Sequence, residues 1–378
     1  AQALLGQGLE AQTVLRGSSL AGPCSSPAAM AAIPTIDFAP FLADEGCVVG
    51  ESPTAGQFRV AEQIDGAMRE HGFLYMDLGI PGDEVQAMFD TSRRLFERPD
   101  DEKCAQLARW TADTNRGYVP MWAQGINPKR APDMHDGFVV KSPSVFDNDL
   151  RGTPAGFDQA VSAFWDKLEL AARRFSVACA VALGLPSSDL DFFAKHFGRC
   201  DMCVMRYNHY PPCDFVPGST DGSSATAGLR IGEHTDFGTF TFVFMDGEAR
   251  GLQARKTQEG DALGVENVEG ADPAWFDVPG RGGGVAVVNS GAMLAQWSND
   301  VWKATAHRVI VPDAEEASQH RYTLPFFAVA DTSAVVETHP VLVPEGEKPR
   351  YAPTTSGEYI RMRLKAMEDG GQKLPVAP

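Results

Sequence analysis

A histidine and an aspartate stand two positions apart in the stretch LRIGEHTDFGTFTFVFMD, residues 229–246. They are His234 and Asp236. On extended backbone, side chains two residues apart project to the same side, so an imidazole and a carboxylate would lie together. Both groups bind divalent metals, and a metal held by this pair needs a third protein ligand. The pair alone is a weak signal, because three-residue patterns recur by chance.

A histidine on a later strand would complete the set, and His307 in KATAHRVI is the best candidate. Its β-branched neighbours predict a strand. Two histidines and one carboxylate with open positions form the ligand set of non-haem Fe(II) oxygenases. The other six histidines fit less well, because they lie at helix ends, in loops, in the tail or on faces that alternation turns away: His71, His135, His196, His209, His320 and His339.

A candidate receptor for an anion follows in the segment RYT, residues 321–323. Arg321 and Thr323 share one face by period two, and a guanidinium beside a hydroxyl binds a carboxylate well. The polar segment 312–320 predicts a hairpin that places Arg321 beside the strand of His307. Asn208 and Tyr210 form another pair on one face, and the Tyr210 hydroxyl can donate to the same ligand. A surface ion pair is the alternative role of Arg321, but the apolar residues after it favour burial.

The elements that must position these residues fall into two groups. In the first half, apolar residues at helical spacing predict long helices, with strands at 33–38 and 73–78 and a turn-rich connection at 116–120. From about residue 200, short strands separated by Gly, Pro and Asp predict a double-sheet β barrel. The predicted helices span 58–71, 81–97, 157–183, 190–197 and 357–367. The predicted strands of the barrel span 203–210, 231–236, 239–244, 251–254, 275–278, 285–289, 305–311, 321–328 and 334–337.

Composition narrows the class of protein. The 378 residues are 43% hydrophobic and 22% charged, the balance of an ordinary globular protein. Fifty acidic and 33 basic residues give a net charge of -17, which argues against a nucleic-acid partner. No apolar run reaches the length of a membrane span, so no membrane partner is expected.

Seven cysteines, an odd number without a spacing framework, favour a reducing compartment, and we expect a cytoplasmic protein. Cys200 and Cys203 form a C-x-x-C, but no second pair completes a zinc site, so structural thiols are the preferred interpretation. Residues 1–32 carry only two charged side chains and are interpreted as a disordered tail, with an organellar targeting remnant as the alternative.

Taken together and in order, these motifs resemble the iron- and 2-oxoglutarate-dependent dioxygenases of the isopenicillin N synthase-like family. The resemblance extends from Ile33 to Leu364. It rests on His234-Thr235-Asp236, His307, Arg321-Tyr322-Thr323 and Asn208-His209-Tyr210-Pro211-Pro212, and on the flanking segments IPTIDF, HGFLYMDLGIP, RGYVP, DMHDGF, GLQAR, VVNSGAML, HRVIVP, RYTLPFF and GEYIRMRL.

The resemblance implies a mixed α+β fold: a distorted double-stranded β-helix, or jelly roll, with a helical N-terminal region and a C-terminal helix. It implies that His234, Asp236 and His307 bind Fe(II). It also implies that 2-oxoglutarate chelates the iron, while a second set of residues holds its distal carboxylate, with ascorbate as a reductant. That set is Arg321 and Thr323, with Tyr210 and Asn208. The family usually has Ser at Thr323, and many members have Asp at Ala292.

The expected reaction is hydroxylation, desaturation or cyclisation of a small molecule by O2, with release of succinate and CO2, in secondary metabolism. The alternatives are an oxidase that needs no 2-oxoglutarate, as in isopenicillin N synthase, and a catalytically silent ligand-binding barrel. A monomer is expected. Candidates for the substrate site, each of which could equally be core, are Tyr118, Met121, Trp122, Phe237 and Phe327.

Four regions are predicted. Residues 1–32 form the tail, 33–199 the mainly helical dioxygenase region, 200–340 the jelly-roll core, and 341–378 the C-terminal helix and tail.

Overall fold

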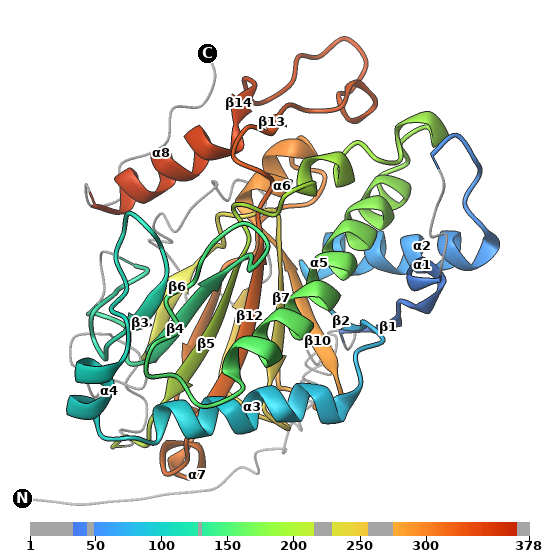
Figure 1. Cartoon of the computed structure of the whole chain (residues 1–378). Coiled ribbons are helices and arrows are strands. Elements are labelled where there is room, and N and C mark those ends of the chain that lie inside the picture. The colour runs from blue at the N-terminus through green and yellow to red at the C-terminus, as the bar shows by residue number, and fades with distance from the viewer. Residues whose placement is uncertain (1–32, 44–48, 128–130, 215–228, 256–274, 369–378) are drawn as a thin grey trace, which may run out of the picture. The chain divides into compact units, whose positions relative to one another are not determined.

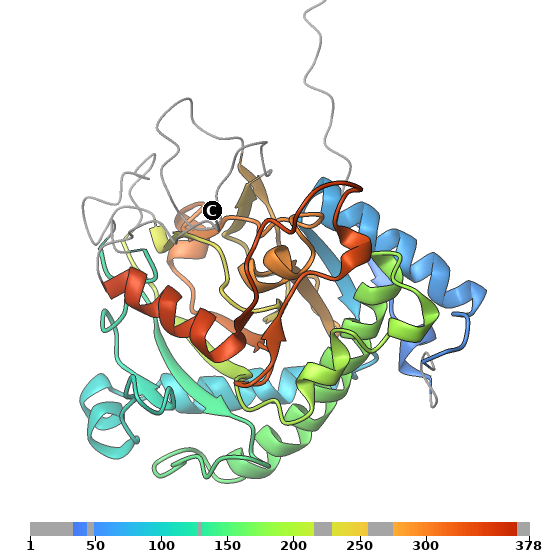
Figure 2. The same cartoon turned by 90° about the horizontal axis from the view of Figure 1, so that it is seen from above.

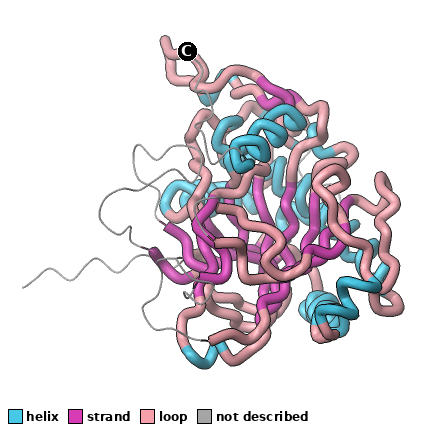
Figure 3. The backbone as a smooth tube through the Cα atoms, turned by 90° about the vertical axis from the view of Figure 1, so that its left-hand side faces the viewer, coloured by secondary structure: helices cyan, strands magenta, loops and turns pink. Residues whose placement is uncertain are grey.

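The computed structural model describes residues 33–43, 49–127, 131–214, 229–255 and 275–368. Two sheets dominate it, and the strands gather centrally with the helices outside them (Figure 3). The larger has the order β1-β2-β10-β7-β12-β5-β4-β3, and the smaller the order β6-β11-β8-β9. Their bounds are β1 (Thr35–Asp37), β2 (Phe73–Asp77), β3 (Gly117–Val119), β4 (Asp136–Lys141), β5 (Val204–Tyr210), β6 (Leu229–His234), β7 (Phe240–Met245), β8 (Leu252–Arg255), β9 (Trp275–Asp277), β10 (Val285–Ser290), β11 (His307–Ile310) and β12 (Arg321–Ala328).

An apolar cluster joins the two sheets. Its members come from β2, β5, β7 and β10 of the large sheet and from β8 and β11 of the small one. Tyr75 and Val287 contribute from the large sheet, and Ala254 and Val309 from the small one. Two sheets with a shared core are the architecture of a jelly roll. Tyr210, one of the predicted site residues, belongs to this apolar layer.

The opposite face of the large sheet is covered by helix α5 (Phe157–Ala182), which crosses it in Figure 1. The Phe175 ring packs edge-on against Phe240 and Phe242 of β7. Trp165 of the same helix packs against Phe326 of β12. Each fully buried Phe contributes roughly 1.5–3 kcal/mol. The alternating phenylalanines of β7 are therefore helix-facing core.

Further helices surround the sheets. They are α1 (Ala39–Leu42), α2 (Ala55–Glu70), α3 (Gly82–Phe96), α4 (Asp100–Gln106), α6 (Ala292–Trp297), α7 (Ala314–Ala317) and α8 (Ser356–Glu368). Thr54 and Gln57 close the start of α2 as a capping box. Acidic residues open α3 and arginines end it, as the helix dipole favours. Seen from above, α8 lies over the strands (Figure 2).

The predicted hairpin between His307 and Arg321 is wrong. Strand β11 belongs to the small sheet, where it pairs with β6 and β8, whereas β12 lies in the large sheet between β5 and β7. The connection contains α7, which Asp313 caps by accepting from the Glu316 N–H at 2.9 Å. A capped helical turn redirects the chain from one sheet to the other. Arg321 therefore lies in the large sheet, whereas His307 lies in the small one.

Three smaller predictions also need correction. Residues 116–120 are not only a connection, because 117–119 form edge strand β3, which pairs with β4. Neither β4 nor α4 was predicted. The predicted helix 190–197 is replaced by the short 3-10 helix η2 (Ala194–Phe197), which another, η1 (Ser187–Asp189), precedes. The predicted strand 334–337 is shortened to β13 (Val335–Val336), which pairs with β14 (Thr354–Thr355) in a separate two-stranded sheet.

Among the described residues, no helix is long and apolar enough to cross a membrane. The tail predicted for residues 1–32 lies outside the described residues. The boundaries predicted at 199/200 and 340/341 stay predictions.

Candidate active site

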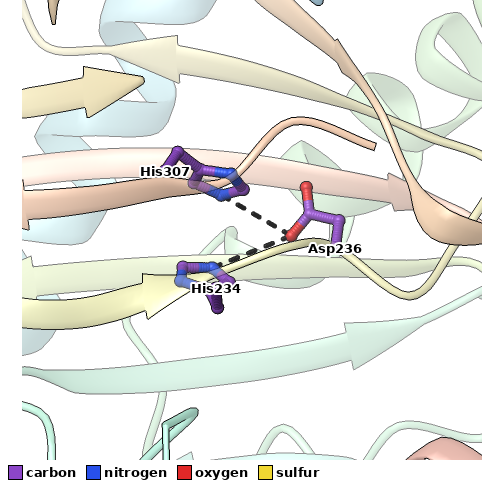
Figure 4. Close-up of side chains that lie close together, drawn as sticks. All are labelled: His234, Asp236 and His307. Atoms are coloured by element: carbon purple, nitrogen blue, oxygen red, sulfur yellow. Dashed lines mark ion pairs between the residues drawn. The ribbon is translucent and has the colours of Figure 1, made fainter. Parts of the chain in front are cut away.

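Three predicted ligands come together at the end of the small sheet. His234 is the last residue of β6 and stands directly opposite His307, the first residue of β11. The Asp236 Oδ1 atom lies 3.9 Å from the His234 Nε2 atom and 3.8 Å from the His307 Nε2 atom. All three ligand atoms lie within 4.8 Å of one another (Figure 4). The strand ends at His234, two residues earlier than predicted, so a turn and not a continuing strand brings Asp236 round.

Both imidazoles present an unprotonated nitrogen to this point. The His234 Nδ1 atom lies 2.8 Å from the Gly232 carbonyl oxygen, and the His307 Nδ1 atom lies 3.1 Å from the Thr305 carbonyl oxygen. A carbonyl only accepts, so each Nδ1 carries the proton and donates it. Each Nε2 lone pair is then free for a metal. Burial, and then His307, lowers the pKa of His234 to about 4, so this imidazole is neutral at neutral pH.

The carboxylate of Asp236 is held by two side chains from the large sheet. Its Oδ2 atom accepts from the Thr241 hydroxyl at 2.6 Å and from the Asn289 amide at 2.8 Å. Thr241 and Asn289 stand opposite each other where β7 pairs with β10. The Oδ1 atom is thereby left to face the imidazoles. Fixing one oxygen of a ligating carboxylate through its neighbours is typical of metal sites.

The charge of Asp236 is also secured. Burial by itself raises the pKa of this carboxyl, but His307, His234 and the hydrogen bonds from Asn289 and Thr241 outweigh it and lower the pKa below its ordinary value. Its backbone carbonyl accepts from the Ala292 N–H at 2.8 Å. The family's frequent Asp at that position is therefore not needed for this contact. Two imidazoles and one carboxylate form a donor set that fits a divalent iron.

The predicted receptor for a carboxylate lies across the barrel. On β12 and β5, Arg321 pairs with Tyr210 and Thr323 with Asn208. All four side chains are buried. The Arg321 guanidinium lies 5.0 Å from the centre of the Tyr210 ring, and its Nε atom donates to the Arg250 carbonyl at 2.9 Å.

Arg321 has spare capacity to bind a ligand. Among the described residues, its Nη1 atom has no hydrogen-bond partner and no carboxylate forms an ion pair with it. The side chain is 4% exposed, so it is not the surface ion pair considered as its alternative role. Burying a cation without a counter-ion is costly. An anionic ligand at this end would remove that cost.

Sequence reasoning missed a second cation here, Arg230. It is fully buried, its Nη2 atom donates to the Glu316 carbonyl at 3.2 Å, and its Nε and Nη1 atoms have no partner among the described residues. Its guanidinium lies 5.8 Å from the centre of the Tyr210 ring. Alternation along β6 puts Arg230 on the face of His234. This shared face was the signal in the sequence that could have identified Arg230.

The candidate substrate residues are more scattered. The Tyr118 hydroxyl donates to Asp136 at 3.0 Å within a buried network that also contains Lys103. Trp122 is 41% exposed in a left-handed backbone conformation, and Met121 beside it is partly exposed. These contacts do not join Tyr118 to the triad.

Two candidates lie nearer the metal site. Phe237 follows Asp236, and Arg363 of α8 lies 4.7 Å from its ring centre. Phe327 shares the inner face of β12 with Arg321 and Thr323 by alternation.

Comparison with known proteins identifies the class. Residues 33–191 match the N-terminal family described as non-haem dioxygenase in morphine synthesis, and residues 200–330 match the 2OG-Fe(II) oxygenase superfamily. A 2-oxoglutarate-Fe(II) type oxidoreductase of Metarhizium rileyi is 26% identical over 365 residues, which cover 90% of this chain and 93% of that protein. A 2-oxoglutarate-dependent dioxygenase of Dothideomycetidae sp. is 30% identical over 312 residues, which cover 76% and 84%.

Solved structures agree. The crystal structure of a full-length Neurospora crassa protein in complex with alpha-KG, which is 2-oxoglutarate, is 26% identical, has a TM-score of 0.71, and matches 88% of this chain and 96% of that one. The expected jelly-roll fold, Fe(II) and 2-oxoglutarate are thereby confirmed, and the 2-oxoglutarate-independent oxidase and the silent barrel are disfavoured. Because the similarity spans nearly the whole of these relatives and the donor set fits iron, this chain belongs to the 2OG-Fe(II) oxygenase superfamily and is a 2-oxoglutarate-dependent dioxygenase.

Proposed function

We propose that His234, Asp236 and His307 bind the Fe(II) of this dioxygenase. One observation carries the proposal: two imidazole Nε2 atoms and one carboxylate oxygen converge within 4.8 Å. The hydrogen bonds at each Nδ1 fix the ring orientations. Three protein ligands leave metal positions open for the co-substrate and for O2.

We further propose that Arg321, Thr323 and Tyr210 hold the distal carboxylate of 2-oxoglutarate. Arg321 supplies the charge, Thr323 a hydroxyl on the same face, and Tyr210 a hydroxyl from the neighbouring strand. Asn208, which pairs with Thr323, lies one step further along that face. The apolar layer between the sheets excludes water, which strengthens these charge-assisted bonds.

When bound, Fe(II) and 2-oxoglutarate supply an oxidative decarboxylation to succinate and CO2, coupled to oxidation of a C–H bond in a small molecule. The residues of the chain bind the iron and both substrates, orient them and shield them from water. We propose that the enzyme acts as a monomer in the cytoplasm. The five described cysteines are free thiols, as a reducing compartment predicts. Size-exclusion chromatography and cell fractionation test these two points.

The test is succinate formation from 2-oxoglutarate with Fe(II) and ascorbate, measured for wild type, His234→Ala and Arg321→Ala over a panel of small molecules. Wild type should give succinate, His234→Ala should lose bound iron, and Arg321→Ala should keep iron but need far more 2-oxoglutarate. O2 uptake independent of 2-oxoglutarate would instead indicate the oxidase. Absence of Fe(II) binding would indicate the silent barrel.

A further inference from the structure

The inner face of β5 continues beyond the proposed co-substrate residues. Tyr210, Asn208 and Arg206 alternate with outward-facing residues and so share one face. Two residues of strand advance about 6.6 Å, so Arg206 lies roughly 13 Å along the strand from Tyr210. Tyr210 stands opposite Arg321 and Asn208 opposite Thr323. The two arginines therefore start from opposite ends of this face, and the Arg206 side chain reaches back to His135, whose ring centre lies 5.7 Å from that of Tyr210.

Arg206 is a cation whose charge Asp133 partly compensates without a direct ion pair. Its Nη2 atom lies 3.1 Å from the Gln124 Oε1 atom and 3.3 Å from the His135 Nε2 atom, and its Nε atom has no partner among the described residues. No described carboxylate forms an ion pair with it. Another enclosed cation of the chain, Lys103, does have one: its Nζ atom lies 2.7 Å from Asp136.

Arg206 also differs from Arg321 and Arg230 in its exposure. Protein surrounds its guanidinium, and this burial lowers its pKa, but a guanidinium stays protonated at any ordinary pH. The side chain nevertheless keeps solvent-accessible surface, whereas Arg321 is 4% and Arg230 is 0% exposed. A charge that is enclosed by protein but still reachable suits a ligand that enters from solvent.

Two neighbours have unused polar atoms. Because the His135 Nε2 atom accepts from Arg206, the Nδ1 atom of this imidazole carries the proton, and it has no partner in the described part of the chain. Burial, followed by Arg206, lowers the pKa of His135 to about 3, so the ring stays neutral. The Asn208 Oδ1 atom is likewise unpartnered, and the amide can turn its NH2 toward a ligand.

The same residues converge in space. A Cβ atom on Gly137 would lie 3.3 Å from the Asn208 Oδ1 atom and 3.6 Å from the Arg206 Nη2 atom. The acidic group that faces them is Asp133, but its oxygens accept from the Ile126 N–H at 2.9 Å and from the Gly232 N–H at 3.4 Å. Burial raises the pKa of Asp133 to about 6, so its charge is also reduced in acid. Asp133 is mostly charged at neutral pH, but two backbone N–H groups engage its oxygens, so the donors around Arg206 stay available to a ligand.

This end of β5 also adjoins the metal site. The segment that carries His135 is bonded to the strand that carries His234: the Met134 N–H donates to the Arg230 carbonyl at 2.8 Å, and the Asn127 amide donates to the Glu233 carbonyl at 3.0 Å. Strands β4 and β5 are neighbours in the large sheet, whereas β6 is the edge strand of the small sheet. The segment that holds His135 against Arg206 is therefore bonded to the strand that ends in His234.

We propose that Arg206, with His135 and Asn208, binds a carboxylate of the primary substrate, so that the enzyme oxidises small carboxylic acids. One guanidinium matches the single charge of a carboxylate and its two-oxygen geometry, whereas a phosphate dianion would call for further cations. The inference rests on the proposed function, because it assumes that 2-oxoglutarate occupies the Arg321 end. The Arg321 end then binds the co-substrate, and the Arg206 end binds the substrate.

The test uses the full chain loaded with Mn(II), which supports no turnover, and 2-oxoglutarate. The probes are aromatic, aliphatic and alicyclic monocarboxylates, each paired with its primary amide of nearly equal size. Thermal stabilisation identifies binders, and titration gives Kd. The variants are Arg206→Gln, Arg206→Lys, and Arg59→Gln as a matched control on the exposed face of α2.

The proposal predicts that some acids stabilise the wild type more than their amides do. For these acids, Arg206→Gln should raise the Kd about 100-fold and Arg206→Lys about 10-fold. Arg59→Gln should change nothing. The stabilisation by 2-oxoglutarate itself should survive in both Arg206 variants, which also shows that they fold; if Arg206→Gln does not fold, Arg206→Lys decides.

Three results overturn the proposal: no acid binds better than its amide, acids bind Arg206→Gln as well as wild type, or the acids compete with 2-oxoglutarate. Failure of the proposed function would give a different result, because Mn(II) and 2-oxoglutarate would then fail to stabilise even the wild type.

Discussion

The two ends of the inner face of β5 are built differently. At the Arg321 end, every contributing side chain comes from a strand, and Arg321, Tyr210 and Thr323 are all buried. At the Arg206 end, the partners Gln124 and His135 come from the segment that precedes β4. Strands hold side chains rigidly, whereas connecting segments can change without disturbing the sheets. A fixed co-substrate suits the first end, and a substrate particular to one enzyme suits the second.

The proposed metal site serves both ends from the opposite sheet. His234 and His307 lie in the small sheet, while Thr241 and Asn289 reach Asp236 from the large one. The largest expected effect therefore comes from Asp236→Ala, which removes the only charged ligand. We expect loss of bound iron and at least about a 1000-fold fall in succinate formation, because metal coordination supplies several kcal/mol to such reactions. Iron content and succinate are measured together; a variant that keeps both would refute the assignment.

The next effect separates the two ends. Arg321→Gln should weaken 2-oxoglutarate about 100-fold, or ~2.7 kcal/mol, because a buried carboxylate loses its charged partner. Iron binding should stay unchanged. The preference for acids over amides, measured at saturating 2-oxoglutarate, should also stay unchanged, whereas Arg206→Gln should show the reverse pattern. If both variants lose 2-oxoglutarate to the same degree, the ends do not have separate roles.

A smaller effect on Fe(II) affinity is expected for the residues that hold the Asp236 carboxylate. Asn289→Ala removes the 2.8 Å hydrogen bond to the Asp236 Oδ2 atom but no ligand. Fe(II) affinity should fall about 10-fold, the lower range for such supporting contacts. Titration with Fe(II) under anaerobic conditions measures this. Thr241→Val removes the other bond and serves as the parallel variant, and the Kd for 2-oxoglutarate at saturating iron should not move in either.

The smallest effect concerns Arg230, which lies beside the same Tyr210 ring as Arg321 but donates to a backbone carbonyl. Arg230→Met keeps the side-chain volume and removes the charge. We expect 2-oxoglutarate to bind about fivefold more weakly, or ~1 kcal/mol, as for loss of a charge at a distance. Calorimetric titration of 2-oxoglutarate checks this, with Arg59→Gln as control. An effect as large as that of Arg321→Gln would make Arg230 an equal partner.

How much of this was predictable depends on the range of each interaction. Period two led to the pairing of His234 with Asp236, but a turn after His234 and not a continuing strand brings the two side chains together. The strand at His307 does follow from its β-branched neighbours. The shared face of Arg321 and Thr323 also follows from period two. Local patterns could not show that segment 312–320 crosses between sheets, because a polar segment suits a hairpin and a crossover equally. The structure distinguishes the two, because the segment contains helix α7, which Asp313 caps.

Contacts made by sheet pairing were out of reach. Thr241 and Asn289 meet at Asp236 because β7 and β10 pair in one register, and nothing near either residue specifies that register. His135 meets Arg206 because β4 pairs with β5, and β4 itself was not predicted. The shared face of Arg206, Asn208 and Tyr210, however, could have been inferred from alternation alone.

The most direct test of the account is a crystal structure of the full chain with Mn(II) and 2-oxoglutarate. We predict Mn(II) bound by His234, Asp236 and His307, with the distal carboxylate of 2-oxoglutarate on Arg321 and Thr323, and Arg206 not in contact with the co-substrate. A metal bound elsewhere, or the distal carboxylate seated on Arg206, would contradict the account.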